Sequence, residues 1–211
     1  MLWIFGDSFS TQWEKMGELG TRYSEWKGYT PKIFSNYLST MLSTDVTQCG
    51  TSGADNYTIF DSIINNIPYM TTDDIVVIGW SHPSRFRLEK NNKWISVRNV
   101  QSELETYKFV DVKTLQQISV NRMSRLYWDE VIGWSTLLTT LFHLKGIRVI
   151  FWSPFTLTID TNFKKLPKDW HIGTLLERLR DETSGVIDDT HFSESGHKEL
   201  ADIIYKKILS K

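Results

Sequence analysis

The chain has 211 residues, of which 40% are hydrophobic and 23% are charged, a composition typical of a globular protein that buries its own core. Its 24 lysines and arginines nearly balance its 25 aspartates and glutamates, which argues against nucleic acid or an anionic membrane as a partner. The single cysteine, Cys49, cannot form an internal disulfide, and no apolar run is long enough to span a membrane.

The first half of the chain alternates short apolar runs with amphipathic segments. Residues 2–5 are apolar and predict a buried strand, whereas residues 9–26 are largely polar and interrupted by glycines, which predicts a loop. Thr30 and Pro31 predict a helix cap and a first helical residue. Beyond them we expect a helix over 33–42, a strand over 46–49, the glycine-rich turn "CGTSGADN", a helix over 57–67 and a buried strand over 74–80.

The second half begins with a change of pattern. Residues 85–98 alternate around Asn91-Asn92, which predicts a β-hairpin that opens an insertion at about residues 85–120. A long helical pattern over 121–145 is closed by Gly146. After it we expect a buried strand over 147–152, a helix at 175–179, a short strand at 185–187 and a terminal helix over 194–209.

Strands that alternate with helices pair in parallel through right-handed crossovers. The sequence therefore predicts an α/β fold of three layers, α/β/α, around a central parallel sheet, in a single domain over residues 1–211. Ligands of such sheets bind beyond the carboxyl ends of the strands. The segments that follow predicted strands are thus the candidate site segments: 6–8, 50–56, 79–82 and 188–197.

A serine, a histidine and an aspartate fall in these segments. Ser8 follows the first strand, and His191 lies three residues after Asp188. That spacing lets the carboxylate accept a hydrogen bond from one ring nitrogen while the other faces outward. These are the residue types of a nucleophile, a general base and the group that orients the base.

Other chemistries that use the end of a first strand lack their residues here. An aspartyl-phosphate phosphatase needs a second aspartate where Phe9 stands, and the turn after the strand has neither Gly-x-Gly-x-x-Gly nor Gly-Lys-Ser/Thr. The histidines show no His-x-x-x-His or cysteine pairing. We therefore expect no metal site and no cofactor.

Three motifs together resemble one family. "FGDSFS" after the first strand, "GTSG" after the second and "DDTHFSESGH" near the end resemble the GDSL or SGNH hydrolase superfamily in order and position. The resemblance implies a flavodoxin-like fold and ester hydrolysis in which Ser8 is the nucleophile, His191 the base and Asp188 its orienting partner. It also implies an oxyanion hole made by the backbone N–H groups of Ser8 and Gly53 and by an asparagine side chain in a Gly-x-Asn-Asp motif.

The chain departs from the family in that last motif. It reads "GWSHP", with Ser81 in place of the asparagine and His82 in place of the aspartate. We expect Ser81 to be the substitute donor, because it directly follows the strand. Asn56 and His82 are the alternatives.

Each site residue also has a plainer interpretation. A Gly-Asp-Ser sequence such as residues 6–8 is most often a turn or a helix cap. His191 can be a surface-loop histidine whose hydrogen bonds are satisfied locally. Asp189 competes with Asp188. Gly53 can simply supply a positive φ angle, Asn56 can cap the following helix, and His197 is expected to pack or to cap.

The sequence as a whole predicts a serine-dependent ester hydrolase. Its expected substrate is a small acyl ester or an acylated carbohydrate, with an O-acetyl group first, because many aromatic side chains allow sugar stacking; a lysophospholipid or a thioester comes next. The rival class is a non-catalytic binding or structural module that keeps the fold, for which the altered "GWSHP" motif is the best argument. Without a basic segment ahead of an apolar stretch at the start, we expect a cytoplasmic protein of bacterial or phage origin.

Overall fold

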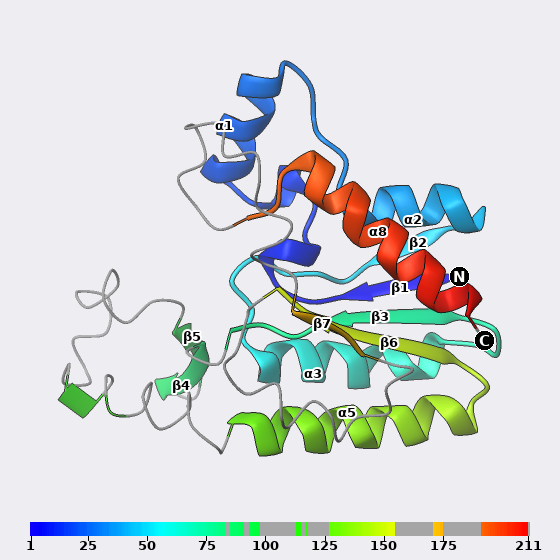
Figure 1. Cartoon of the computed structure of the whole chain (residues 1–211). Helices are drawn as coiled ribbons and strands as arrows, with labels where there is room; N and C mark the ends of the chain where they lie inside the picture. The colour runs from blue at the N-terminus through cyan, green and yellow to red at the C-terminus, as the bar shows by residue number, and fades with distance from the viewer. Residues whose placement is uncertain are drawn as a thin grey trace.

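The computed structural model describes residues 1–82, 85–90, 93–97, 113–114, 117, 127–154, 171–174 and 191–210. Within these residues, a central parallel sheet of five strands carries helices on both faces (Figure 1). Its strand order is β2-β1-β3-β6-β7. The strands are β1 (Leu2–Phe5), β2 (Val46–Gln48), β3 (Ile75–Gly79), β6 (Arg148–Ser153) and β7 (His171–Thr174).

This order is that of doubly wound, flavodoxin-like sheets, in which the first strand lies between the second and the third. The chain winds one way from β1 to β2 and the other way from β3 to β6. Ligands of such folds bind where the direction reverses, outside the carboxyl ends of β1 and β3. The predicted α/β/α fold with a central parallel sheet is therefore confirmed, and its topology points to the segments that follow these two strands.

The core consists of two apolar layers, one on each face of the sheet. On one face, Val76 and Ile78 of β3 pack with α3 (Asn56–Asn66) and α5 (Tyr127–Leu144). On the other, Val77 packs with α2 (Phe34–Leu42) and α8 (Glu194–Leu209). Neighbouring residues of a strand face opposite sides, and a strand buried on both faces is apolar throughout, which is why these runs could be recognised.

The predicted loop over residues 9–26 is wrong. The segment contains two 3₁₀ turns, η1 (Ser8–Ser10) and η2 (Trp13–Lys15), and the helix α1 (Glu18–Lys27). Only Gly20 and Tyr23 of α1 are buried, so the helix has no apolar stripe that a periodicity argument could detect. Gly20 is needed there because a Cβ would collide with the carbonyl group of Trp13.

The predicted cap at Thr30 and Pro31 is also wrong, because α2 begins only at Phe34. The side chain of Asn36 accepts a hydrogen bond from the Ile33 backbone N–H at 3.0 Å. The N–H of Lys32 donates instead to the Glu194 carboxylate of α8 at 3.1 Å. The segment before α2 is therefore held by α8 and does not form the first turn of a helix.

The other predicted elements differ from the structure mainly at their ends. The predicted hairpin is present as β4 (Phe86–Lys90) paired antiparallel with β5 (Lys93–Val97), and a 3₁₀ turn, η3 (Ile67–Tyr69), follows α3. β7 was not predicted. The helix expected at 175–179, the strand expected at 185–187 and nearly all of the insertion beyond the hairpin lie outside the described residues.

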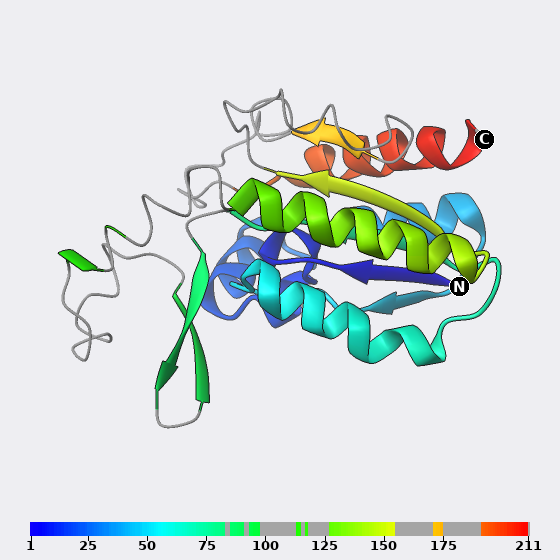
Figure 2. The same cartoon turned by 90° about the horizontal axis from the view of Figure 1, so that it is seen from below.

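Figures 1 and 2 show that η1, α1 and the β4–β5 hairpin lie beyond the carboxyl ends of the sheet strands, whereas the two chain ends lie at the opposite edge. In the part of the chain that the structure describes, none of the helices combines the length and the apolar character that crossing a membrane requires.

Candidate active site

Ser8 is positioned by a capped turn at the end of β1. The Asp7 carboxylate accepts a hydrogen bond from the Phe9 N–H at 3.1 Å, and the Asp7 carbonyl accepts one from the Ser10 N–H at 2.9 Å. Asp7 is thus the N-cap of η1, and Ser8 is its first residue. β1 ends at Phe5. The sequence Gly-Asp-Ser follows it because Asp7 caps the turn that starts at Ser8.

The turn is packed tightly against the ends of the neighbouring strands. A Cβ at Gly79, the last residue of β3, would lie 3.0 Å from Ser10 Oγ, and one at Gly6 would lie 3.0 Å from the Gly79 carbonyl oxygen and closer still to the Ser10 side chain. A Cβ at Gly50 would collide with the Ser10 backbone. The absence of side chains at these glycines lets η1 rest directly on the sheet, which fixes where Ser8 stands.

Ser8 and Gly53 carry polar groups without hydrogen-bond partners among the described residues. The residue is 5% exposed, and its Oγ has no hydrogen-bond partner among the described residues. The backbone N–H groups of Ser8 and Gly53 likewise donate to no described residue. Gly53 follows β2 with φ +75°, a conformation that favours glycine. Buried polar groups are normally satisfied, so the unpartnered Ser8 Oγ at the end of β1 marks a candidate ligand site.

The structure brings His191 to the η1 turn, which contains Ser8. Its ring stacks on the ring of Phe9, the residue after Ser8, with centroids 4.7 Å apart, and it meets the Trp13 ring edge-on at 6.4 Å. Although Ser8 Oγ and His191 Nε2 are both buried, no hydrogen bond joins them. Asp188 and its competitor Asp189 lie outside the described residues.

His191 owes its place to the start of α8. Ser193 caps that helix by accepting a hydrogen bond from the Gly196 N–H at 3.1 Å. The neighbouring Glu194 carboxylate accepts hydrogen bonds from the hydroxyl groups of Tyr29 at 2.6 Å and Tyr37 at 3.0 Å. These contacts anchor the segment that carries the histidine to the region around α2.

Asn56 and Ser81 form a pair across the site. The Asn56 side chain accepts from the Ser81 N–H at 2.7 Å and donates to the Ser81 carbonyl at 3.2 Å. The cap of α3 is Asp55, which accepts from the Thr58 N–H at 2.8 Å, so Asn56 is not the helix cap that one interpretation made it. It holds the backbone after β3 instead.

The Ser81 side chain points toward Asp7, the N-cap of η1. Its hydroxyl donates to Asp7 Oδ2 at 2.8 Å. The same carboxylate oxygen accepts a hydrogen bond from Arg85 Nη1 at 2.7 Å, and Nη1 also lies 3.0 Å from Ser81 Oγ. Arg85 was not among the predicted site residues, and no sequence pattern links it to Asp7, from which it is separated by 78 positions.

Two histidines near the site are held in their neutral form. Burial, and then the positive charge of Arg85, lower the pKa of His82 to about 4, against the opposing effect of the Asp7 charge. Burial, and then the charge of His191, lower the pKa of His197 to about 3. The His197 ring packs against Phe34 at 6.3 Å and Phe192 at 5.6 Å, so the expectation that this histidine packs is confirmed.

We expect these two histidines to make the protein sensitive to acid. Their folded pKa values lie below the ordinary value near ~6.5, so between about pH 6.5 and pH 4 the unfolded chain binds protons that the folded chain does not. Above about pH 6.5 the two histidines are neutral in both the folded and the unfolded chain, so they do not lower the free energy of unfolding there. The free energy of unfolding falls within it by up to about 1.4 kcal/mol per histidine per pH unit.

Urea unfolding of the wild type and of His197→Phe at pH 7 and pH 5 measures this effect. The pH dependence of the variant should be weaker by about one proton. His143→Gln, a change on the exposed side of α5, is the matched surface control. An unchanged pH dependence in His197→Phe would contradict the expectation.

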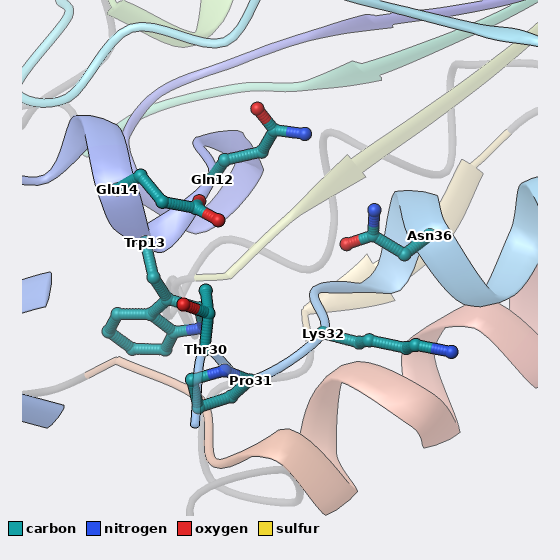
Figure 3. Close-up of a pocket in the computed structure, with 7 residues that line it drawn as sticks. All are labelled: Gln12, Trp13, Glu14, Thr30, Pro31, Lys32 and Asn36. Atoms are coloured by element: carbon teal, nitrogen blue, oxygen red, sulfur yellow. The ribbon is translucent and has the colours of Figure 1, made fainter. Parts of the chain in front are cut away.

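A polar pocket lies beside the site, between η2 and the start of α2. It has a volume of about 120 Å³ and is lined by Gln12, Trp13, Glu14, Thr30, Pro31, Lys32 and Asn36 (Figure 3). Trp13 is 1% exposed, and its indole Nε1 has no hydrogen-bond partner among the described residues. Since the Trp13 ring also meets the His191 ring, one side chain connects the pocket to the predicted base.

The described residues include no group of three or more histidine, cysteine or acidic side chains that could hold a metal ion. No family model matches the sequence, and no curated protein matches it. Among solved structures, the chain is similar to that of a proposed lipolytic protein of the G-D-S-L family from Desulfitobacterium hafniense DCB-2, with 13% sequence identity, 98% of each chain covered and a TM-score of 0.43. Likeness at this level does not place the chain in that family.

Proposed function

We propose that the protein is a serine-dependent ester hydrolase with Ser8 as the nucleophile. The observation that carries this proposal is the buried, unpartnered Ser8 Oγ on a capped turn at the end of β1. The N–H groups of Ser8 and Gly53 are also without partners among the described residues, and the His191 ring packs on the Phe9 side chain. A nucleophile, a base and oxyanion donors are the parts that acyl transfer requires.

The reaction follows from these positions. Ser8 Oγ attacks the ester carbonyl carbon while His191 takes the hydroxyl proton, and the carbonyl oxygen gains negative charge near the N–H groups of Ser8 and Gly53. The alcohol leaves with the proton from His191, and an acyl-enzyme remains on Ser8. Water then attacks the acyl carbon, with His191 as base again, which releases the acid and restores the serine. Asp188 is the proposed partner of His191 on the opposite side of its ring.

The proposed substrate is an acylated carbohydrate, with an O-acetyl group as the acyl part. The polar pocket supports it, because its amide, carboxylate and hydroxyl side chains suit hydroxyl groups of a sugar. The connection of that pocket to His191 through Trp13 would place such a ligand close to the reacting ester. An acetyl esterase and a lysophospholipase or thioesterase differ in acyl length, so a series of p-nitrophenyl esters separates them.

Activity-based labelling tests the proposed function. A fluorophosphonate should modify the wild-type protein, and peptide mapping should place the label on Ser8. The matched control is Ser10→Ala. Ser10 Oγ is also buried without a partner in the same turn, but it packs against Gly6 and Gly79. Ser10→Ala should therefore be labelled like the wild type.

Two outcomes would contradict the proposal. If the label falls on a residue other than Ser8, the nucleophile is wrongly assigned. If no label attaches and no p-nitrophenyl ester is hydrolysed, the protein is a non-catalytic module with this fold, a class that the altered motif after β3 also suits.

A further inference from the structure

The guanidinium group of Arg85 contacts Ser81, the residue expected to supply the side-chain donor of the site. Ser81 occupies the position at which the resembled family has an asparagine, and a serine side chain is shorter than a carboxamide. Arg85 Nη1 is 3.0 Å from Ser81 Oγ, so the guanidinium is in direct contact with the end of the shorter side chain. The single proton of the Ser81 hydroxyl is donated to Asp7, which leaves that hydroxyl nothing to offer an oxyanion.

Arg85 has donors left over. Both of its hydrogen bonds, to Asp7 and to Ser81, are made through Nη1. A guanidinium carries five N–H donors in a rigid plane, and those of Nη2 and Nε donate to no described residue. The side chain is only 17% exposed, and a donor that is largely shielded from water is worth more to a developing charge than one in water.

The charge balance of the site also needs this arginine. Asp7 immediately precedes Ser8, and its side chain is 2% exposed. A buried carboxylate this close to the nucleophile would repel the negative charge that develops on the substrate oxygen. The contact of 2.7 Å with Arg85 neutralises it and at the same time fixes the direction of the guanidinium.

We propose that Arg85 is the third oxyanion donor of this site, in place of the asparagine of the resembled family. Asp7 and Ser81 hold Nη1, and the remaining N–H groups of the guanidinium are directed at the carbonyl oxygen as it becomes negative. This assignment rests on the proposed function. It adds a residue from the base of the β4–β5 hairpin to donors that follow β1 and β2.

Steady-state kinetics with p-nitrophenyl acetate test the assignment. Arg85→Ala should lower kcat by ~10²- to 10³-fold with little change in KM, because the contact forms only as charge develops. Arg85→Lys keeps the charge but has a single ammonium group in place of the planar guanidinium. Its kcat should therefore lie between that of the wild type and that of Arg85→Ala. The matched control is Arg87→Ala, which removes a second arginine that ties the β4–β5 hairpin to the described sheet and helices, through Asp61 at 2.8 Å, and should retain the wild-type kcat.

Chemical rescue distinguishes a role of Arg85 as a hydrogen-bond donor from a purely structural role. Millimolar guanidinium chloride should restore a measurable share of kcat to Arg85→Ala, while the same concentration of tetramethylammonium chloride should not. The double variant Asp7→Asn/Arg85→Met removes both charges and keeps the fold testable if Arg85→Ala is unstable. It should stay as slow as Arg85→Ala, because the donor is still missing.

The assignment is overturned if Arg85→Ala keeps its kcat, if Arg87→Ala loses as much, or if guanidinium gives no rescue in a folded Arg85→Ala. It is also overturned if the double variant recovers wild-type kcat, since Arg85 would then only compensate the Asp7 charge. In each of these cases the wild type is still labelled at Ser8. A wild type that is neither labelled nor active overturns the proposed function and this assignment together.

Discussion

Replacing Ser8 with alanine is expected to lower kcat for p-nitrophenyl acetate by at least ~10⁴-fold, because removal of a nucleophile leaves only the small rate enhancement of the remaining site. Fluorophosphonate labelling should be lost in the same variant. The measurement is steady-state turnover over a range of enzyme concentrations, which separates residual activity from contamination.

The fold should tolerate the change. Ser8 Oγ makes no hydrogen bond to a described residue, so alanine leaves no partner unsatisfied, and the free energy of unfolding should change little. Ser10→Ala is the control for a hydroxyl lost from the same turn and should keep full turnover. Substantial turnover by Ser8→Ala would refute the assigned nucleophile, even with labelling at Ser8 in the wild type.

Replacing Asp7 with alanine is expected to cost about 3–5 kcal/mol of unfolding free energy, because it leaves a largely buried guanidinium without its partner. The Ser81 hydroxyl and the Phe9 N–H lose their acceptor as well. Asp7→Asn keeps an oxygen for one of these donors and should cost less. Urea unfolding at pH 7 gives the midpoints and slopes from which the differences are calculated.

Asp61→Ala is the matched control for an ion pair that also anchors the hairpin. Arg87 donates to Asp61 at 2.8 Å, but the Asp61 side chain is 55% exposed. Water and salt screen such a pair, so its loss should cost less than about 1 kcal/mol. If Asp7→Ala is no more destabilising than Asp61→Ala, the buried network does not stabilise the site in the way described.

The extent to which the fold was predictable depends on burial. β1, β3 and β6 are buried on both faces and leave apolar runs in the sequence, and α8 buries one regular face that includes Leu200, Ile204 and Ile208. α1 and β7 have no such signature. α1 is mostly polar and buries only Gly20 and Tyr23, and the four residues of β7, His171–Thr174, contain one large apolar side chain.

Candidate site residues that stand in short local motifs could be predicted from the sequence. Residues that are linked only by contacts in the folded chain could not. Ser8 and Gly53 follow β1 and β2 in local motifs, and His191 stands in a local motif ahead of α8, so these candidates could be named from their order in the chain. The link between Asp7 and Arg85 joins residues 78 positions apart, and it depends on how the hairpin packs against the turn. Ser81 lies within hydrogen-bond distance of Asp7, the residue before Ser8, and the direction of its hydroxyl follows from that carboxylate.

Both ends of the chain lie at the amino edge of the sheet, opposite η1 and the hairpin (Figure 1). A purification tag or a surface linker attached at either end therefore projects away from Ser8. Protein immobilised through such a linker would present the carboxyl edge of the sheet to the solution, so even a bulky acylated polysaccharide could approach that edge from the side opposite the support.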